Sequence, residues 1–183
     1  MGLRLGNSGA TVQGRSATRP RDYGLAAFRI ALGAYWLYEQ HWKLPPDFGL
    51  HQPRGLMFAF QQSIQYPTLG LYKRFLQDLV VPNFHVVGWL VFLTEVGIGV
   101  SLVLGLCTTA GALVGTGQAI NLLISQASTP ERPWIYLAIL VANLFVLLTP
   151  SNQQLSLDRI LAPRLATAAA HGRRLPRLLL WLM

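Results

Sequence analysis

Between Asp78 and Glu131 lie 52 residues whose only formal charge is Glu95. At the composition of an ordinary soluble domain, a stretch of that length would hold roughly 13 charged residues. The whole chain shows the same deficit, because 52% of its 183 residues are hydrophobic and only 12% are charged. Such a stretch cannot form a soluble surface. The sequence therefore argues against a soluble enzyme, a nucleic-acid-binding domain and a disordered tail.

Four apolar segments are each about as long as a bilayer core requires. They cover residues 23–41, 84–106, 108–127 and 134–149. The second and third segments are joined by only a couple of residues around Cys107, which predicts a helical hairpin. The sequence therefore predicts an all-α fold, in which residues 23–150 form a bundle of four transmembrane helices.

The long loop between the first two spans, residues 42–83, carries an amphipathic pattern near its end. Its apolar side chains recur at spacings of three and four, and they are Leu69, Tyr72, Leu76, Leu79 and Val80. This spacing predicts a short helix that lies on the outer membrane surface or caps the bundle.

The basic residues are concentrated at the two ends of the chain. Residues 1–22, predicted to be a flexible tail, contain four arginines, and residues 151–183, predicted to lie in the membrane interface, contain five. Cytoplasmic segments of membrane proteins are enriched in Lys and Arg. We therefore expect a multi-pass protein of a prokaryotic cytoplasmic membrane with both termini inside and loop 42–83 outside. The net charge of +8 then reflects orientation, and the expected partners are the lipid bilayer and other subunits of a membrane complex, not nucleic acid.

Cysteine and histidine restrict the chemistry further. The single cysteine, Cys107, forms no disulfide or dithiol pair within the chain. His41 and His85 lack a suitably spaced third ligand, so no metal site is expected.

Polar side chains inside the predicted spans need partners or a purpose, because an ionisable group at the centre of a membrane helix costs ~2.5–3.5 kcal/mol on insertion scales. At about 1.5 Å per residue, Arg29 and Glu95 lie within about one helical turn of each other in depth, which predicts an ion pair. Gln118, Asn121 and Asn143 fall in the same layer. The layer is interpreted either as packing between helices or as a site for a polar head group or a proton relay.

A second polar group lies near the expected outer face and includes Trp36, Glu39 and Lys43. It is interpreted as an aromatic belt with charged side chains at the interface. A quinone site is the alternative, because a quinone head needs hydrogen-bond donors and a proton-handling group beside aromatic walls.

Two stretches, FRIALGAYWLYEQHWKL and TEVGIGVSLVLGLCTTAGALVG, resemble the DoxX/DoxD family of small four-helix membrane proteins, and the similarity covers roughly residues 24–161. The residues that match the family's pattern are Arg29, Gly33, Lys43, Leu44, Glu95, Gly97, Gly99, Gly105, Ser156, Leu157 and Asp158. The family takes its name from a subunit of a thiosulfate:quinone oxidoreductase. The resemblance thus implies a quinone-linked redox setting.

Two functions are compatible with these patterns. The first, which the sequence favours, is a non-catalytic accessory or structural subunit of a larger respiratory or photosynthetic membrane complex. The chain has no mid-membrane pair of haem-ligating histidines, no paired cysteines and no nucleotide-binding loop, so it cannot carry electrons alone.

The second function is the membrane subunit of a quinone-linked oxidoreductase, with no covalently bound cofactor. In this hypothesis Glu95 or Glu39 relays protons, and Arg29 and Lys43 polarise a quinone carbonyl. The remaining residues expected around the quinone are Trp36, Gln118, Asn121 and Asn143.

Overall fold

The computed structural model describes residues 20–130, 133–149 and 155–170, and the regular secondary structure of this part of the chain is entirely helical. The all-α prediction is confirmed. The elements are α1 (Pro20–Tyr38), α2 (Leu56–Gln65), α3 (Gly70–Phe75), the π-helical η1 (Leu76–Val80), α4 (Phe84–Leu104), α5 (Thr108–Gln126), α6 (Pro133–Leu148) and α7 (Leu157–Ala170). Residues 1–19 of the predicted basic tail 1–22, and residues 151–154 and 171–183 of the predicted tail 151–183, lie outside the described residues.

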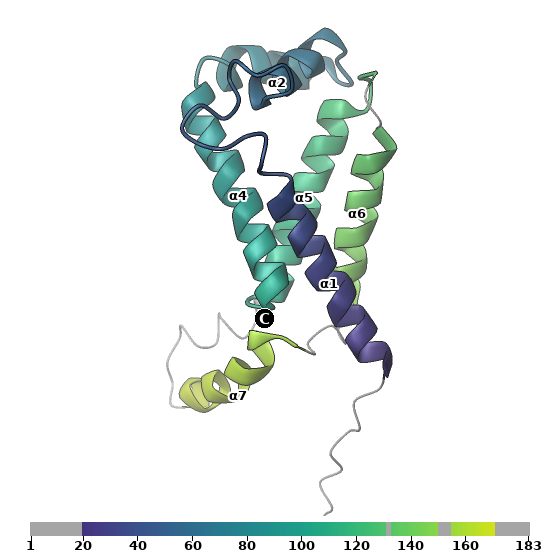
Figure 1. The fold of residues 1–183 in the computed structure, drawn as a ribbon, viewed down its shortest axis with the longest axis vertical. Helices are drawn as coiled ribbons and strands as arrows, with labels where there is room; N and C mark the ends of the chain where they lie inside the picture. Colours follow the sequence, from purple (N-terminus) through teal and green to yellow (C-terminus); the bar gives the residue numbers. More distant parts are fainter. Residues whose placement is uncertain (1–19, 131–132, 150–154, 171–183) are drawn as a thin grey trace, which may run out of the picture.

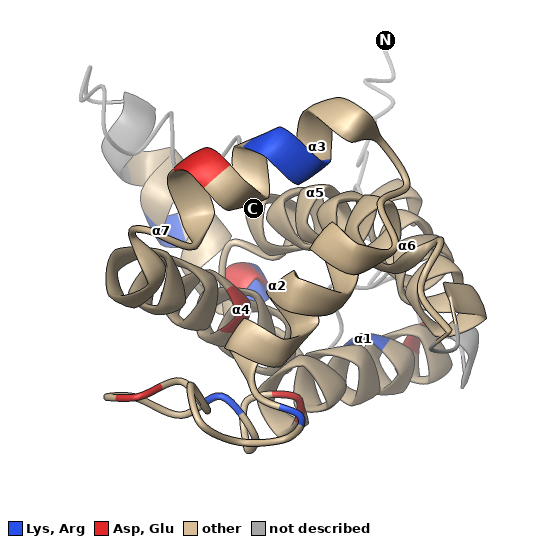
Figure 2. Ribbon diagram, turned by 90° about the horizontal axis from the view of Figure 1, so that it is seen from above, with Lys and Arg blue, Asp and Glu red and all other residues tan. Residues whose placement is uncertain are grey.

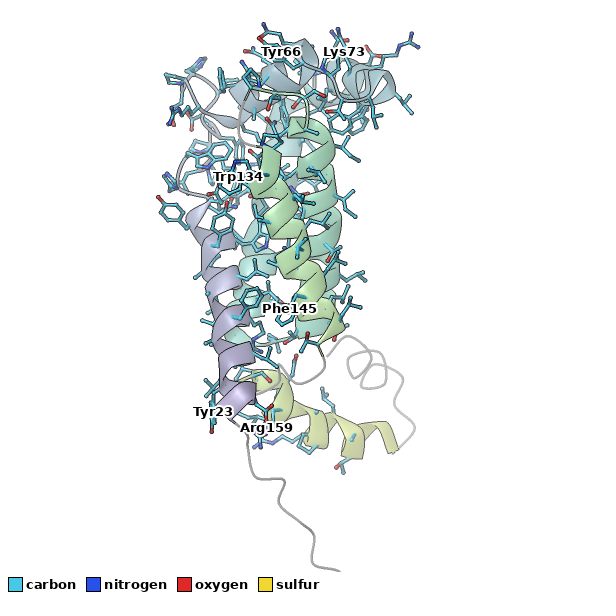
Figure 3. The ribbon with its side chains drawn as sticks, turned by 90° about the vertical axis from the view of Figure 1, so that its right-hand side faces the viewer. Tyr23, Tyr66, Lys73, Trp134, Phe145 and Arg159 are labelled. Carbon is cyan, nitrogen blue, oxygen red and sulfur yellow. The ribbon has the colours of Figure 1, made fainter. Side chains whose placement is uncertain are left out.

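The four long helices α1, α4, α5 and α6 form an elongated bundle (Figure 1). α1 packs mainly on α4, and α5 packs on both α6 and α4. α2, α3 and η1 lie across one end of the bundle, which we call the lid end, and α7 lies at the other, the tail end (Figure 1). Figure 3 shows Tyr66 and Lys73 at the lid end and Tyr23 and Arg159 at the tail end.

Among the described helices, α4 is the one that is both long and apolar enough to cross a membrane by length and composition. It has 21 residues and a single charged side chain, Glu95. α6 is also apolar but shorter, at 16 residues. A view from the lid end shows how few charged residues lie on the long helices, whereas several lie on the loop and on α3 (Figure 2).

Small residues set the spacing of α1 and α4. A Cβ atom added to Gly33 would lie 2.8 Å from the carbonyl oxygen of Gly99, so the two backbones approach too closely for a larger side chain. Close backbone approach of this kind is common where membrane helices pack, because packing rather than water exclusion drives their association.

The loop between α1 and α4 folds back over the bundle and has a small core of its own. Phe48, Leu56 and Phe84 are buried together there, and Leu56 opens α2, a helix that the sequence pattern did not predict. α3 and η1 cover the predicted amphipathic stretch, but only part of its apolar side is buried. Leu76 and Val80 are buried, whereas Leu69 and Leu79 are exposed.

Candidate functional site

Glu95 lies in the middle of α4, and its side chain is completely buried. α4 begins at Phe84, so at about 1.5 Å per residue Glu95 lies about 16 Å from the lid end of the helix. A carboxylate at this depth is stable only with ionic and hydrogen-bonding partners.

The partners of Glu95 come from two other parts of the chain. Lys43 forms an ion pair with Oε2 of Glu95, and the side-chain amide of Gln40 donates a hydrogen bond to the same oxygen. From α5, Nε2 of Gln118 donates to Oε1 at 3.2 Å. Both carboxylate oxygens are therefore satisfied by side chains. The side chain of Lys43 is only 5% exposed, so the pair as a whole is desolvated.

The turn after α1 brings Gln40 and Lys43 to this depth. α1 ends at Tyr38, and successive backbone hydrogen bonds then fold the chain inward, including those from Gln40 N to Leu37 O and from Lys43 N to Gln40 O. The Lys43 ammonium lies 4.6 Å from the centre of the Trp42 ring, a cation–π contact that offsets part of its lost hydration.

The predicted ion pair between Arg29 and Glu95 is wrong. Within the described residues Glu95 pairs with Lys43, whereas Arg29 donates from a guanidinium nitrogen to the backbone oxygen of Leu155 at 2.9 Å. Arg29 also lies against Gly105, ten residues or about 15 Å further along α4 than Glu95. The depth estimate failed because it considered only groups inside the four apolar segments, and the groups around Arg29 include residues that follow α6.

The acid at the tail end is Asp158, which is 1% exposed. Its two oxygens accept hydrogen bonds from the backbone N–H groups of Cys107 and Thr108 at 2.8 and 2.9 Å. These groups open α5, where unpaired N–H groups favour a carboxylate. Its own N–H donates to the carbonyl of Gly105, so α7 is fastened to the α4–α5 turn.

A cavity lies beneath the lid, beside Glu95. The volume that the centre of a water molecule can occupy in this cavity is about 70 Å³. This volume is enough for several waters. The charged and amide groups at its wall are Glu39, Lys43, Glu95, Gln118, Asn121 and Gln126. The aromatic groups are Tyr35, Trp36, Trp42, Phe60, Tyr72 and Tyr136.

One wall residue has an unmatched donor. Trp36 is 2% exposed, and its indole N–H has no hydrogen-bond partner in the part of the chain that the structure describes. A buried donor without a partner costs about 1–3 kcal/mol. Trp36 lines the cavity, so this unmatched donor belongs to a residue of the cavity wall.

A family model described as TQO small subunit DoxD matches residues 24–175. The chain belongs to the DoxD family. The comparisons with curated proteins and with solved structures find no match. The family resemblance given by the sequence motifs is confirmed, and together with the apolar α4 it makes the chain a membrane-associated protein.

In this DoxD family member, most of the residues expected at a site do meet at one cavity. They are Trp36, Glu39, Lys43, Glu95, Gln118 and Asn121. The remaining two lie elsewhere. Arg29 is at the tail end, and Asn143 packs between α6 and α5, where its amide donates to Ile139 O at 2.8 Å and its side-chain oxygen lies against Gly115.

Sequence reasoning missed Gln40 and the fastening of the lid. Gln40 follows Glu39 directly, and only the end of α1 at Tyr38 makes it face Glu95. On α2, the Ser63 hydroxyl lies 2.6 Å from the Ser125 hydroxyl of α5. Thus α2 is held to the bundle by buried polar contacts, which no apolar periodicity reveals.

The described part of the DoxD chain contains no cluster of three or more His, Cys, Asp or Glu side chains that would hold a metal ion. The site instead offers buried hydrogen-bond donors, one ion pair and aromatic walls.

Proposed function

We propose that this chain is the membrane subunit of a quinone-linked oxidoreductase, and that the cavity beneath the lid holds the quinone head. The observation that carries the proposal is the buried Lys43–Glu95 pair at the wall of an aromatic cavity. The family description supports it, because TQO stands for the thiosulfate:quinone oxidoreductase to which the sequence resemblance also pointed.

The residues at the cavity fit a quinone. A quinone head is a flat ring with two carbonyl oxygens, and it needs donors for those oxygens and aromatic or apolar walls for the ring. Trp36 and Lys43 both lie at the cavity wall and carry such donors, an indole N–H and an ammonium. Tyr35, Phe60 and Tyr136 supply the walls.

When bound, a quinone supplies two-electron chemistry in which reduction also requires two protons. Within this chain, Lys43 would orient a carbonyl oxygen and Glu95 would relay protons beside it. Glu39 lines both this cavity and a second opening at the lid end, so it is suited to exchange protons with the medium. Electrons would come from a partner subunit, because the chain has one cysteine and no haem-ligating histidine pair.

The membrane arrangement that this function requires has all four long helices crossing the bilayer, with the lid outside. The arginine-rich ends of the sequence support cytoplasmic termini, and an even number of crossings agrees with them. In this arrangement Glu95 lies near the middle of the membrane and the cavity opens toward the outer side.

The test compares two neutralising variants with a matched control in membranes that contain the whole complex. Glu95→Gln alone leaves Lys43 buried without its counter-charge, so the double variant Lys43→Met/Glu95→Gln is used to remove both charges and preserve folding. We expect quinone reduction per assembled molecule to fall by about 10²-fold or more in both variants, since a positioned acid–base group contributes on that order.

The control is Asp158→Asn, which alters the other buried carboxylate by the same chemical change. It should lower the thermal stability and leave turnover per assembled molecule at the wild-type level. Normal turnover in the assembled double variant would contradict the quinone site. It would instead favour a purely structural subunit, whose buried ion pair serves packing.

A further inference from the structure

A second concave surface adjoins the cavity on one side of the bundle. It is a groove of about 340 Å³, on the same measure as the cavity, between the lid segment α3–η1 and the helices α4 and α5. Its lining is mostly apolar and includes Phe75, Leu76, Leu79, Val87 and Leu90. Leu79 and Leu90 are more than half exposed, so the groove is open to the surroundings of the bundle.

The groove and the cavity are adjacent and share part of their walls. Phe60, Tyr72, Val91, Gln118 and Asn121 line both of them. Gln118 also donates a hydrogen bond to Glu95, so one end of the groove lies beside a residue that bonds the buried carboxylate. Tyr72 donates a hydrogen bond to Asn121 at 3.0 Å, which joins α3 to α5 at the boundary between the two spaces.

The groove also lies at a definite depth on α4. Val87, Leu90 and Thr94 are three, six and ten residues after Phe84, which places them about 4–15 Å along the helix from its lid end. α4 is the described helix that is long and apolar enough to span a bilayer. The groove therefore covers the stretch of α4 that would face the acyl chains of the outer leaflet.

We propose that this groove binds the isoprenoid tail of the quinone whose head lies in the cavity. The inference rests on the proposed function. It adds the route by which the ligand enters, which is from the outer leaflet between α3–η1 and α4. The occupant is an amphiphile with one polar ring and a long apolar tail, because a cavity with charged and amide groups at its wall lies directly beside an apolar groove that opens sideways.

The second opening of the cavity has a different character. Its lining combines aromatic residues such as Phe58 with polar and charged residues, which are Glu39, His41, Arg54, Gln62 and Gln126. It therefore suits an apolar tail less well than the groove does. In the experiments below, this opening is the control site with which the groove is compared.

The experiment uses membranes containing the full chain and a 2,3-dimethoxy-5-methylbenzoquinone whose decyl tail ends in a photoreactive diazirine. After illumination, labelled peptides are mapped by mass spectrometry with and without an excess of the same head lacking the tail. We expect labels on residues 72–94 that the tail-less quinone displaces. Displaceable labels on residues 38–41 or 54–62 instead would overturn the tail groove and leave the quinone site intact.

Labels in the groove that the tail-less quinone does not displace would identify a lipid-binding surface and also overturn the inference. If the quinone binds nowhere and is not reduced, the proposed function fails, and the tail groove fails with it.

Kinetics of two bulky variants give an independent readout. Val87→Trp narrows the groove, whereas Phe58→Trp places the same side chain at the second opening. Val87→Trp should lower kcat/KM for the decyl quinone by about tenfold, on the order of an overpacking effect, with little change for the tail-less quinone. Phe58→Trp should leave the ratio of kcat/KM for the decyl quinone to kcat/KM for the tail-less quinone unchanged. An unchanged ratio in Val87→Trp contradicts the proposal.

Discussion

The bundle buries one acidic and one basic side chain beneath the lid and another acid and base at the tail end, but the two acids are satisfied in different ways. Beneath the lid, the oxygens of Glu95 are bonded by the side chains of Lys43, Gln40 and Gln118 beside a cavity. At the tail end, the oxygens of Asp158 are bonded by backbone N–H groups of the first turn of α5.

This difference shows how an acid with a structural role can be distinguished, in the same chain, from an acid that is a candidate for proton transfer. Backbone donors are fixed by the helix, so Asp158 cannot change partners without unwinding α5. Side-chain donors rotate, and those around Glu95 adjoin space for a ligand or water. Burial alone does not distinguish the two acids, since both are almost completely inaccessible.

The largest loss of stability is expected from breaking the Lys43–Glu95 ion pair beneath the lid, which tests this comparison most directly. Lys43→Met leaves Glu95 buried without a counter-charge, which should cost about 3–5 kcal/mol of stability. Adding Glu95→Gln removes the remaining charge, so the double variant should recover most of that loss. The measurement is thermal unfolding of the detergent-solubilised wild type, single variant and double variant at neutral pH. Equal stability of the single and double variants would show that the two charges are not coupled.

At the tail end, a smaller loss is expected from Gly105→Ala. Gly105 ends α4 with a φ of +63°, which costs a residue with a side chain about 1–3 kcal/mol. A Cβ atom there would also overlap Arg29 and Ser156, so the total should be about 2–4 kcal/mol with the overpacking included. Gly97→Ala, also on α4, meets nothing within 4 Å and is the control. Thermal unfolding of both variants tests this, and equal melting temperatures would refute it.

The smallest expected effect concerns the thiol at the same turn. Burial, and to a lesser extent the negative charge of Asp158, raises the pKa of Cys107. Because the thiolate is the reactive form, the alkylation rate should rise with pH around a midpoint above that of an unperturbed cysteine. Asp158→Asn removes the second cause and should shift the midpoint downward, giving a several-fold faster reaction at pH 8. A faster reaction at every pH with an unmoved midpoint would indicate opening of the turn instead.

The four long helices were predictable from the sequence, because long apolar segments are a direct composition signal, and α4 is the described helix that is long and apolar enough to cross a membrane. Glu95 was found for the same reason, as the one charge in a long apolar run, and Gln118 by its depth on the next helix. The turn after α1 was not predictable from depth arithmetic. The first segment was extended to His41, and Lys43 was thereby assigned to the interface, whereas α1 ends at Tyr38 and the turn directs Lys43 inward.

The groups at the tail end were missed for a related reason. Leu155, which accepts a hydrogen bond from Arg29, and Asp158, which caps α5, follow α6 in a segment that the charge pattern assigned to the membrane interface. Ser156 and Asp158 were nevertheless noted as part of the family pattern. An acid in a motif that closes a bundle is thus a signal for a helix cap elsewhere in the chain.

The fastening of α7 to the start of α5 has a consequence for the order in which the protein is made. The described side chains that bond Glu95 lie between residues 40 and 118 and the cavity wall extends to Ile139, whereas the acid that caps Thr108 is Asp158. At a synthesis rate of about 5–20 residues per second, the ribosome needs about 1–4 s to proceed from Ile139 to Asp158. The residues for the site beneath the lid are therefore all available before the opposite end can close, and a nascent chain that stops after α6 would contain the complete site but no cap for α5.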